Sequence, residues 1–196
     1  MMVSETAFHE AAHAVVAADL RVPFTYVTAV AGPKHGGKLE GGLFKLRLFV
    51  SNRRGGFRRR SAEELRKMAR ERLPRHAVVA LAARALCSSM EFRTASGRRL
   101  PPSKLGYDGD EKIVKDVARQ LGIKGFAAWR EQMLDHARDI VALPHVARAV
   151  QWVARNLETE CQIHAMKRGT GRLSAKDVRW ILCAASGLES GRKKAA

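Results

Sequence analysis

The segment 6–20, TAFHEAAHAVVAADL, restricts the fold more than any other part of this 196-residue chain. It is rich in alanine, the strongest helix former. Ser4 is a good N-cap for a helix that begins here, and Pro23 prevents that helix from continuing. On such a helix His9 and His13 lie on the same face, one turn apart. The fold must therefore place two imidazoles together on one helix.

The residues His9, Glu10 and His13 form the pattern H-E-x-x-H. Two imidazoles at this spacing can bind one zinc ion, and Glu10 lies about 100° around the helix from His9, where it can take a proton from a bound water. Random placement produces this pentapeptide in roughly one or two per hundred chains of this composition. The alternative, a pair of histidines that only pack, is the weaker interpretation.

A catalytic zinc needs three protein ligands and one open position, so the motif is one ligand short. The metzincin continuation is excluded, because Val16 and Asp19 stand where its glycine and histidine would be. One alternative is Asp110, at the start of a predicted helix, where backbone amides would keep the carboxylate ionised; it could equally be only an N-cap. Another is a glutamate from a later helix, the candidates being Glu63, Glu64, Glu158 and Glu160.

The rest of the chain predicts an α+β fold that is predominantly α, with a small sheet near the N-terminus. Strands are expected over 24–31 and 43–50, with a glycine-rich turn over 32–42 between them and a basic loop over 52–60 after them. Ser61 begins a helix with a capping box, and Pro74 is expected to end it. Helices are thus predicted over 61–73, 75–90, 110–121, 126–143, 144–166 and 175–184.

The chain shows no repeat and no linker, which favours one domain over 1–186 and a basic, disordered tail over 187–196. No apolar run approaches the ~20 residues that a membrane-spanning helix needs. The three cysteines are far apart and form no CxxC pair, which is typical of a reducing compartment. We expect a cytoplasmic protein without a membrane span.

The formal net charge is +17, so the protein attracts polyanions or acidic partners. This supports a rival hypothesis, a nucleic-acid-binding protein. Its contacts would come from a basic cluster around Phe57, although a solvated loop has the same composition. No helix-turn-helix, RRM or zinc-finger pattern is present. The arginines of this cluster are Arg53, Arg54, Arg58, Arg59 and Arg60.

Several segments resemble the peptidase domain of the FtsH family of AAA zinc proteases. FHEAAHAVVA resembles its H-E-A-G-H-A helix, with Ala12 in place of glycine, and YVTAVAG and GGLFKLRLFV resemble the strands that follow. AVVALAARALCSSM is similar to an apolar helix of the family, with Arg84 on its Gly-Arg pair and Ser88 and Ser89 in place of two acids. The resemblance extends over residues 6–182.

GYDGDEKIVKDVAR aligns without a gap with the segment that carries the third zinc ligand of the family, and Asp110 falls on that ligand. The resemblance therefore implies a stand-alone, FtsH-peptidase-like zincin. His9, His13 and Asp110 would be the Zn²⁺ ligands and Glu10 the general base, with Glu158 or Glu160 as the fallback ligand. The implied activity is that of a zinc metalloendopeptidase. A catalytically inactive descendant that binds a partner is a further alternative. The presence of Glu10 argues against it, because an inactive protein does not need a general base.

We expect no AAA ATPase module in this chain, whereas the proteases of that family carry one. GPKHGGKL resembles a Walker A loop, but Leu39 stands where serine or threonine must hold magnesium, so no nucleotide-binding residues are expected. The substrate would be unfolded or flexible polypeptide, and a separate ATPase or a homo-oligomer is compatible with the sequence. The strand over 43–50 could bind substrate as an added strand, through Leu43, Phe44, Leu46 and Leu48.

Overall fold

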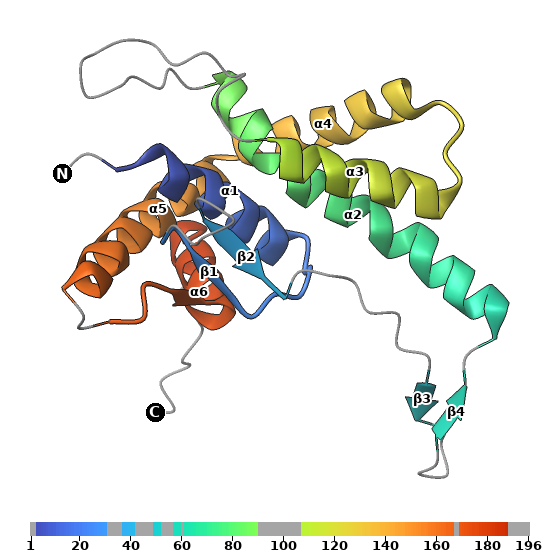
Figure 1. The fold of residues 1–196 in the computed structure, drawn as a ribbon, viewed down its shortest axis with the longest axis horizontal. Helices are drawn as coiled ribbons and strands as arrows, with labels where there is room; N and C mark the ends of the chain where they lie inside the picture. Colours follow the sequence, from blue (N-terminus) through green and yellow to red (C-terminus); the bar gives the residue numbers. More distant parts are fainter. Residues whose placement is uncertain are drawn as a thin grey trace.

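The computed structural model describes residues 3–30, 37–41, 49–51, 57–59, 61–89, 107–166 and 169–187. These residues are predominantly helical with a small antiparallel sheet (Figure 1), which confirms the predicted mainly α, α+β class. The helices are α1 (Glu5–Asp19), α2 (Ala62–Ser89), α3 (Asp108–Leu121), α4 (Phe126–Ala142), α5 (Pro144–Ala165) and α6 (Ala175–Ala185). The strands are β1 (Tyr26–Thr28), β2 (Lys38–Glu40), β3 (Phe49–Ser51), β4 (Phe57–Arg59) and β5 (Leu173–Ser174).

Helix α1 begins where the sequence predicts. The Ser4 side chain accepts a hydrogen bond from the Ala7 backbone N–H at 3.3 Å. Its alanines and valines from Ala11 to Ala17 are buried, because small side chains allow neighbouring helices to approach closely. Helix α1 contacts α2, α5 and α6 and is thus the central helix of the core.

The predicted break at Pro74 is wrong, because α2 continues through this residue. Proline in a helix interior removes one hydrogen bond, which costs about 3 kcal/mol or more. The carbonyl that loses its partner belongs to the exposed Arg70, where water can replace the N–H. Beyond Pro74 the buried side chains of Val78 and Leu81 hold the helix against the core. Tertiary packing therefore outweighs the local cost.

The later helices agree with the prediction, except at the start of α3. That helix begins at Asp108 rather than Asp110, so Asp110 lies inside the first turn and is not the N-cap. Gly122 ends α3 in the left-handed conformation, at φ 67°. At the other end of the chain, Ser174 and Asp177 form the capping box of α6.

The sheet has the order β2-β1-β5, with both pairings antiparallel. Strand β1 is shorter than the predicted strand over 24–31, and β2 lies within the predicted turn over 32–42, so both predictions are corrected. Strand β5 comes from the C-terminal part of the chain. These strands have three residues or fewer, so they are too short to show the alternation of apolar and polar residues that predicts a strand.

Strands β3 and β4 form a separate two-stranded antiparallel ribbon. The predicted strand over 43–50 is therefore described only at its end, and the predicted basic loop over 52–60 contains a strand. A two-stranded ribbon need not bury a face, so charged residues do not exclude it. In Figure 1 this ribbon lies at the far end of α2, away from the sheet that contains β1.

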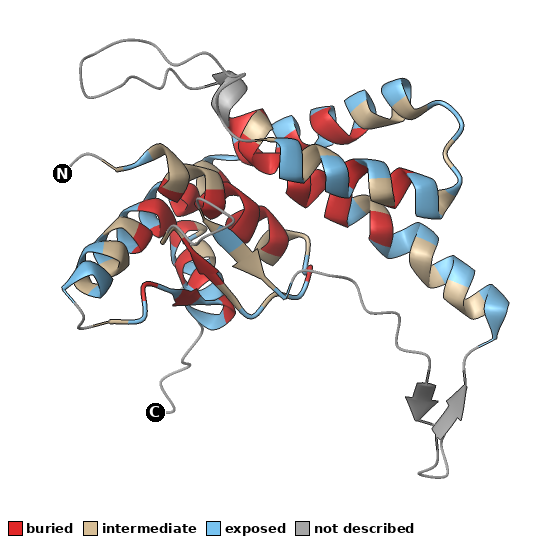
Figure 2. Ribbon diagram, viewed as in Figure 1, coloured by how far each residue is buried: buried red, intermediate tan, exposed pale blue. Residues whose placement is uncertain are grey.

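In space the helices form two groups (Figure 1). One contains α1, α5, α6 and the sheet, and the other contains α2, α3 and α4. Buried residues concentrate where α1 meets the C-terminal half of α2, whereas the N-terminal half of α2 is largely exposed (Figure 2). None of the described helices combines the length and apolarity that a membrane crossing requires. The predicted tail lies outside the described residues, apart from Gly187.

Candidate metal centre

Three side chains from two distant segments meet between the helix groups. His9 Nε2 and His13 Nε2 on α1 are 3.0 Å apart. Asp110 Oδ2 on α3 lies 3.3 Å from the first and 3.4 Å from the second. Among the described residues, this is the one group of three or more His, Cys, Asp or Glu ligand atoms close enough to share an ion.

The dimensions of this triangle suit zinc. Four ligands about 2.0–2.1 Å from a tetrahedral zinc are about 3.3–3.4 Å from one another, close to the three observed separations. Asp110 Oδ2 is also buried, and it lacks a hydrogen-bond donor as long as the two neighbouring Nε2 atoms carry no proton. A buried carboxylate oxygen without a donor is unfavourable, and a cation would supply the missing partner. The residues present therefore fit a zinc ion.

Both imidazoles are held in orientation by their surroundings. The Nδ1–H of His13 donates to the Val79 backbone carbonyl on α2 at 2.6 Å. Because a carbonyl can only accept, Nε2 of the neutral His13 ring has its lone pair toward His9 and Asp110, as a metal ligand requires. The His9 ring stacks on Tyr107, with centroids 5.7 Å apart and planes at 25°. These contacts orient both Nε2 atoms toward the space beside Asp110 Oδ2.

The electrostatics of the cluster are strongly coupled. Burial alone would raise the pKa of Asp110, but the imidazoles, His13 above all, hold it well below its usual range. Burial opposes protonation of His13, yet Asp110 and Glu10 together raise its pKa to about 9. The pKa of His9 is lowered, chiefly by burial. Without metal, the cluster therefore holds a proton as the counter-ion of Asp110.

Glu10 lies beside this cluster and is only 7% exposed. Burial raises the pKa of its carboxyl to about 7. Gly37, just before β2, packs directly against it, and a Cβ at Gly37 would lie 2.5 Å from Glu10 Cγ. Only glycine leaves room for the carboxylate here. A carboxyl whose pKa is near neutral pH is suited to accept and return a proton.

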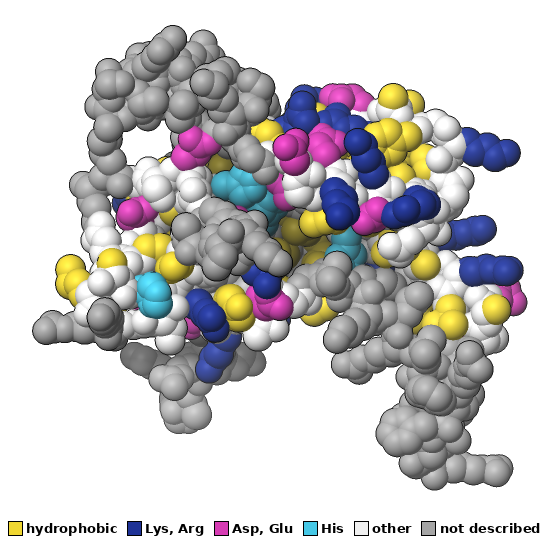
Figure 3. Space-filling model, in the orientation of Figure 1, with side chains coloured by type: hydrophobic (Ala, Val, Ile, Leu, Met, Phe, Trp, Pro, Cys, Tyr) yellow, Lys and Arg dark blue, Asp and Glu magenta, His cyan; other side chains and the backbone are white. Residues whose placement is uncertain are grey.

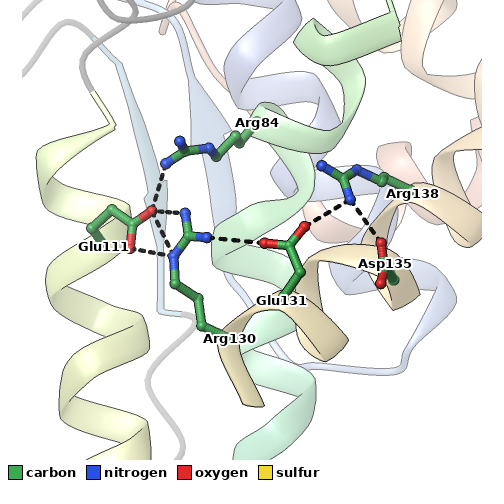
Figure 4. A network of polar contacts seen from close by, with 6 residues as sticks. All are labelled: Arg84, Glu111, Arg130, Glu131, Asp135 and Arg138. Atoms are coloured by element: carbon green, nitrogen blue, oxygen red, sulfur yellow. Dashed lines mark hydrogen bonds and ion pairs between the residues drawn. The ribbon is translucent and has the colours of Figure 1, made fainter. Parts of the chain in front are cut away.

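An ion-pair network supports α3 next to Asp110 (Figure 4). Glu111 accepts a hydrogen bond from Arg84 Nη1 on α2 at 2.6 Å, and it also binds Arg130 on α4. Beyond Arg130 the network continues through Glu131 to Arg138. Arg84 also lies over the Tyr107 ring, 5.8 Å from its centroid. These contacts hold both the carboxylate and the His9 side of the cluster.

The cluster opens into a cavity of about 490 Å³ between the two helix groups. Figure 3 shows this hollow, with hydrophobic side chains on its floor and histidine side chains along it. Glu10, Gly37, the whole of β2 and Ile113 are among its lining residues. A polypeptide lying in this cavity would pass the cluster and β2 together.

The other predicted candidates are not at this site. Glu158 accepts a hydrogen bond from the Ser4 backbone N–H at 3.0 Å, and Glu64 forms the capping box with Ser61. Glu63 and Glu160 are not part of the cluster either. The predicted substrate-binding residues Leu43, Phe44, Leu46 and Leu48, like Arg53, Arg54 and Arg60, lie outside the described residues, while Arg58 and Arg59 lie in β4.

The sequence-based interpretation missed Gly37, Val79, Tyr107, Glu111 and Arg130. Only the Glu111 network left a signal, since Arg84 is the one charged residue in the apolar run from His76 to Leu86 and such a residue needs a partner. Val79 acts through its backbone carbonyl, Gly37 through the absence of a side chain and Tyr107 through its ring, and none of these produces a sequence pattern.

Comparison of the chain with models of protein families, with curated proteins and with solved structures finds no match. The fold and the cluster together define a predominantly helical protein with a candidate three-ligand metal centre.

Proposed function

We propose that this chain is a zinc-dependent endopeptidase with an FtsH-peptidase-like zincin fold, which hydrolyses peptide bonds in unfolded or flexible polypeptide. One observation carries the proposal: the ligand atoms of His9, His13 and Asp110 form a triangle of zinc-site dimensions. A buried carboxyl, Glu10, stands beside that triangle in an open cavity. Two ligands and a base on one helix, with a third ligand from another, is the arrangement that metal-assisted hydrolysis requires.

In this proposal His9, His13 and Asp110 hold the ion, which supplies Lewis acidity to the scissile carbonyl and to a water. Glu10 accepts the proton of the attacking water and returns it to the leaving amine. Gly37 keeps the Glu10 carboxylate in place, and the Val79 carbonyl keeps the His13 ring in the required tautomer.

The substrate would lie along β2. Among the described strands, none pairs with the edge of β2 that faces away from β1. That strand lines the cavity over its whole length and follows directly after Gly37. An extended polypeptide added to this edge would bind through backbone hydrogen bonds, which tolerate many sequences. The proposed added strand therefore pairs with Lys38–Glu40, while the strand predicted over 43–50 is described only at residues 49 and 50. Folded substrates would require a separate ATPase.

The decisive experiment compares wild type with Glu10→Gln on casein and on quenched fluorescent peptides. Loss of a general base lowers the rate about 10²–10⁴-fold, while the zinc content should stay near one ion per chain. The exposed Glu63→Gln variant, at the start of α2 and outside the cluster, serves as the control and should cleave like wild type. Equal cleavage by wild type and Glu10→Gln would refute the proposal.

A further inference from the structure

A second hollow, of about 320 Å³, adjoins the metal cavity at the C-terminal end of α1. Three arginines line it, Arg21 after α1 and Arg72 and Arg75 on α2, and no acidic residue is among its described lining residues. Val22 and His76 line both hollows, so the two lie next to each other. We call this feature the arginine hollow.

Arg21 occupies a backbone position that favours glycine. Its φ is 56°, in the left-handed region. The backbone N–H groups of Arg21 and Val22 donate to carbonyls of the last turn of α1, at 3.2 and 2.8 Å. This is a Schellman motif, in which the left-handed residue is usually glycine. Arginine in this conformation costs conformational free energy, which glycine would avoid.

The Arg21 guanidinium forms no hydrogen bond or ion pair with the part of the chain that the structure describes. Across the hollow, Arg72 and Arg75 are three residues apart and thus share one face of α2. Arg75 Nη1 donates to the Leu20 carbonyl at 3.3 Å, which fixes its position at the end of α1. A hollow lined by three guanidinium groups and by no described acidic side chain has a positive potential, which favours an anion.

Stabilisation of the helix terminus does not explain the cluster. Basic residues near a helix C-terminus stabilise its free carbonyls. Arg75 does so directly, whereas the Arg21 guanidinium contacts none of these carbonyls. A glycine at position 21 would also end α1 at lower conformational cost. Stabilisation of the end of α1 therefore does not explain the Arg21 side chain.

We propose that the arginine hollow binds an acidic side chain of the polypeptide that lies in the metal cavity. Guanidinium groups bind carboxylates through charge-assisted hydrogen bonds. The hollow is a local pocket of about 320 Å³, whereas a nucleic-acid backbone would need several phosphate contacts in a row. The source of the carboxylate rests on the proposed function, but binding itself does not require catalysis. The protein thus selects segments with Asp or Glu at one position along the cleft.

The test measures binding by the full-length, zinc-loaded Glu10→Gln protein, so that hydrolysis plays no part. Labelled octapeptides that differ only by Glu or Gln, scanned through every position, are titrated by fluorescence anisotropy. We expect Glu to improve affinity about three- to tenfold at one position, as for partly exposed charge pairs. Inorganic phosphate should compete with that Glu peptide and not with its Gln counterpart.

Arg21→Gly is the main variant, because glycine suits the backbone and the fold should persist. It should reduce the preference for Glu to less than twofold while leaving the affinity for the Gln peptide unchanged. Arg179→Gln, an exposed arginine on α6, removes the same charge elsewhere and should keep the preference.

Three results would overturn the proposal: no preference for Glu at any position, an equal loss in Arg179→Gln, or tighter binding of random single-stranded DNA that Arg21→Gly abolishes. The proposed function fails separately, if wild type does not cleave any peptide that the Glu10→Gln protein binds.

Discussion

The two ends of the groove between α1 and α2 contrast sharply. At one end, His9, His13 and Asp110 are largely buried, and His13 is tied to the Val79 carbonyl across the groove. At the other end, the three arginines of the arginine hollow are exposed, and Arg75 donates a hydrogen bond to the Leu20 carbonyl. Each end thus has one hydrogen bond between the two helices, but the surroundings differ.

The difference shows that burial determines how strongly the charged groups of a site interact. Inside the protein the effective dielectric constant is low, so each partner of the metal cluster has a large effect. At the arginine hollow, water and salt screen the same charges, and each contributes much less. We therefore expect substitutions in the metal cluster to lower zinc affinity by orders of magnitude, and substitutions in the arginine hollow to lower peptide affinity only several-fold.

The largest effect should follow from Asp110→Asn, which removes the proposed third ligand. Zinc affinity should fall by more than about 100-fold, the upper range for residues that only support ligands. In wild type, chelation with EDTA should lower the melting temperature, because zinc at 1,000 times its Kd stabilises by about 4 kcal/mol. Calorimetric titration and thermal melts measure both. Asp108→Asn, an exposed residue of the same helix, is the control.

Glu111→Gln should have the next largest effect, because Glu111 anchors the turn that carries Asp110 through Arg84 and Arg130. Loss of such support typically weakens metal binding about 10- to 100-fold. A competition assay with a zinc chelator measures this change. Glu131→Gln alters the same network farther from the cluster and should leave zinc affinity within about twofold. If both variants bind zinc like wild type, the network has no role in positioning Asp110.

The metal-free protein should lose stability as the pH rises above 6.5, because below that pH His9, with its pKa lowered by burial, acts in the opposite direction. The pKa of His13 is about 9 in the fold against 6.5 as its ordinary value, so its stabilising charge is complete below pH 6.5 and lost toward pH 9. Glu10, with its pKa raised to about 7, acts in the same direction. Asp110, with its pKa lowered, stabilises above pH 3.8. Urea unfolding with EDTA from pH 5 to 9 measures this trend, which Asp110→Asn should flatten.

The smallest effect concerns the arginine hollow. Arg21→Gly should raise the free energy of unfolding by about 0.5–1 kcal/mol, because glycine adopts the left-handed conformation without a steric cost. Arg21→Ala removes the same charge but keeps the backbone cost, so it should not stabilise. Denaturant melts of the three proteins measure this difference. A destabilised Arg21→Gly would mean that the arginine itself holds the end of α1.

Local signals were sufficient for much of the fold. Ser4 and Pro23 bounded α1, Gly122 ended α3, and Ser174 began α6, because caps and breakers act within a few residues. The same local reasoning failed at Pro74, where packing of α2 outweighed one lost hydrogen bond. It also failed at β2 and β5, which are too short to show a pattern and exist through pairing with β1.

The candidate site also has a part that the local sequence determines and a part that only tertiary packing determines. His9, Glu10 and His13 share a helix face through the period of the helix alone, so their arrangement follows from the amino-acid sequence. The sequence left several carboxylates open as the third ligand, and only the packing of α3 against α2 put Asp110 beside the histidines. Gly37, the Val79 carbonyl and the arginine hollow likewise depend on contacts between segments far apart in the chain. No local pattern encodes such contacts, because they depend on how whole helices pack.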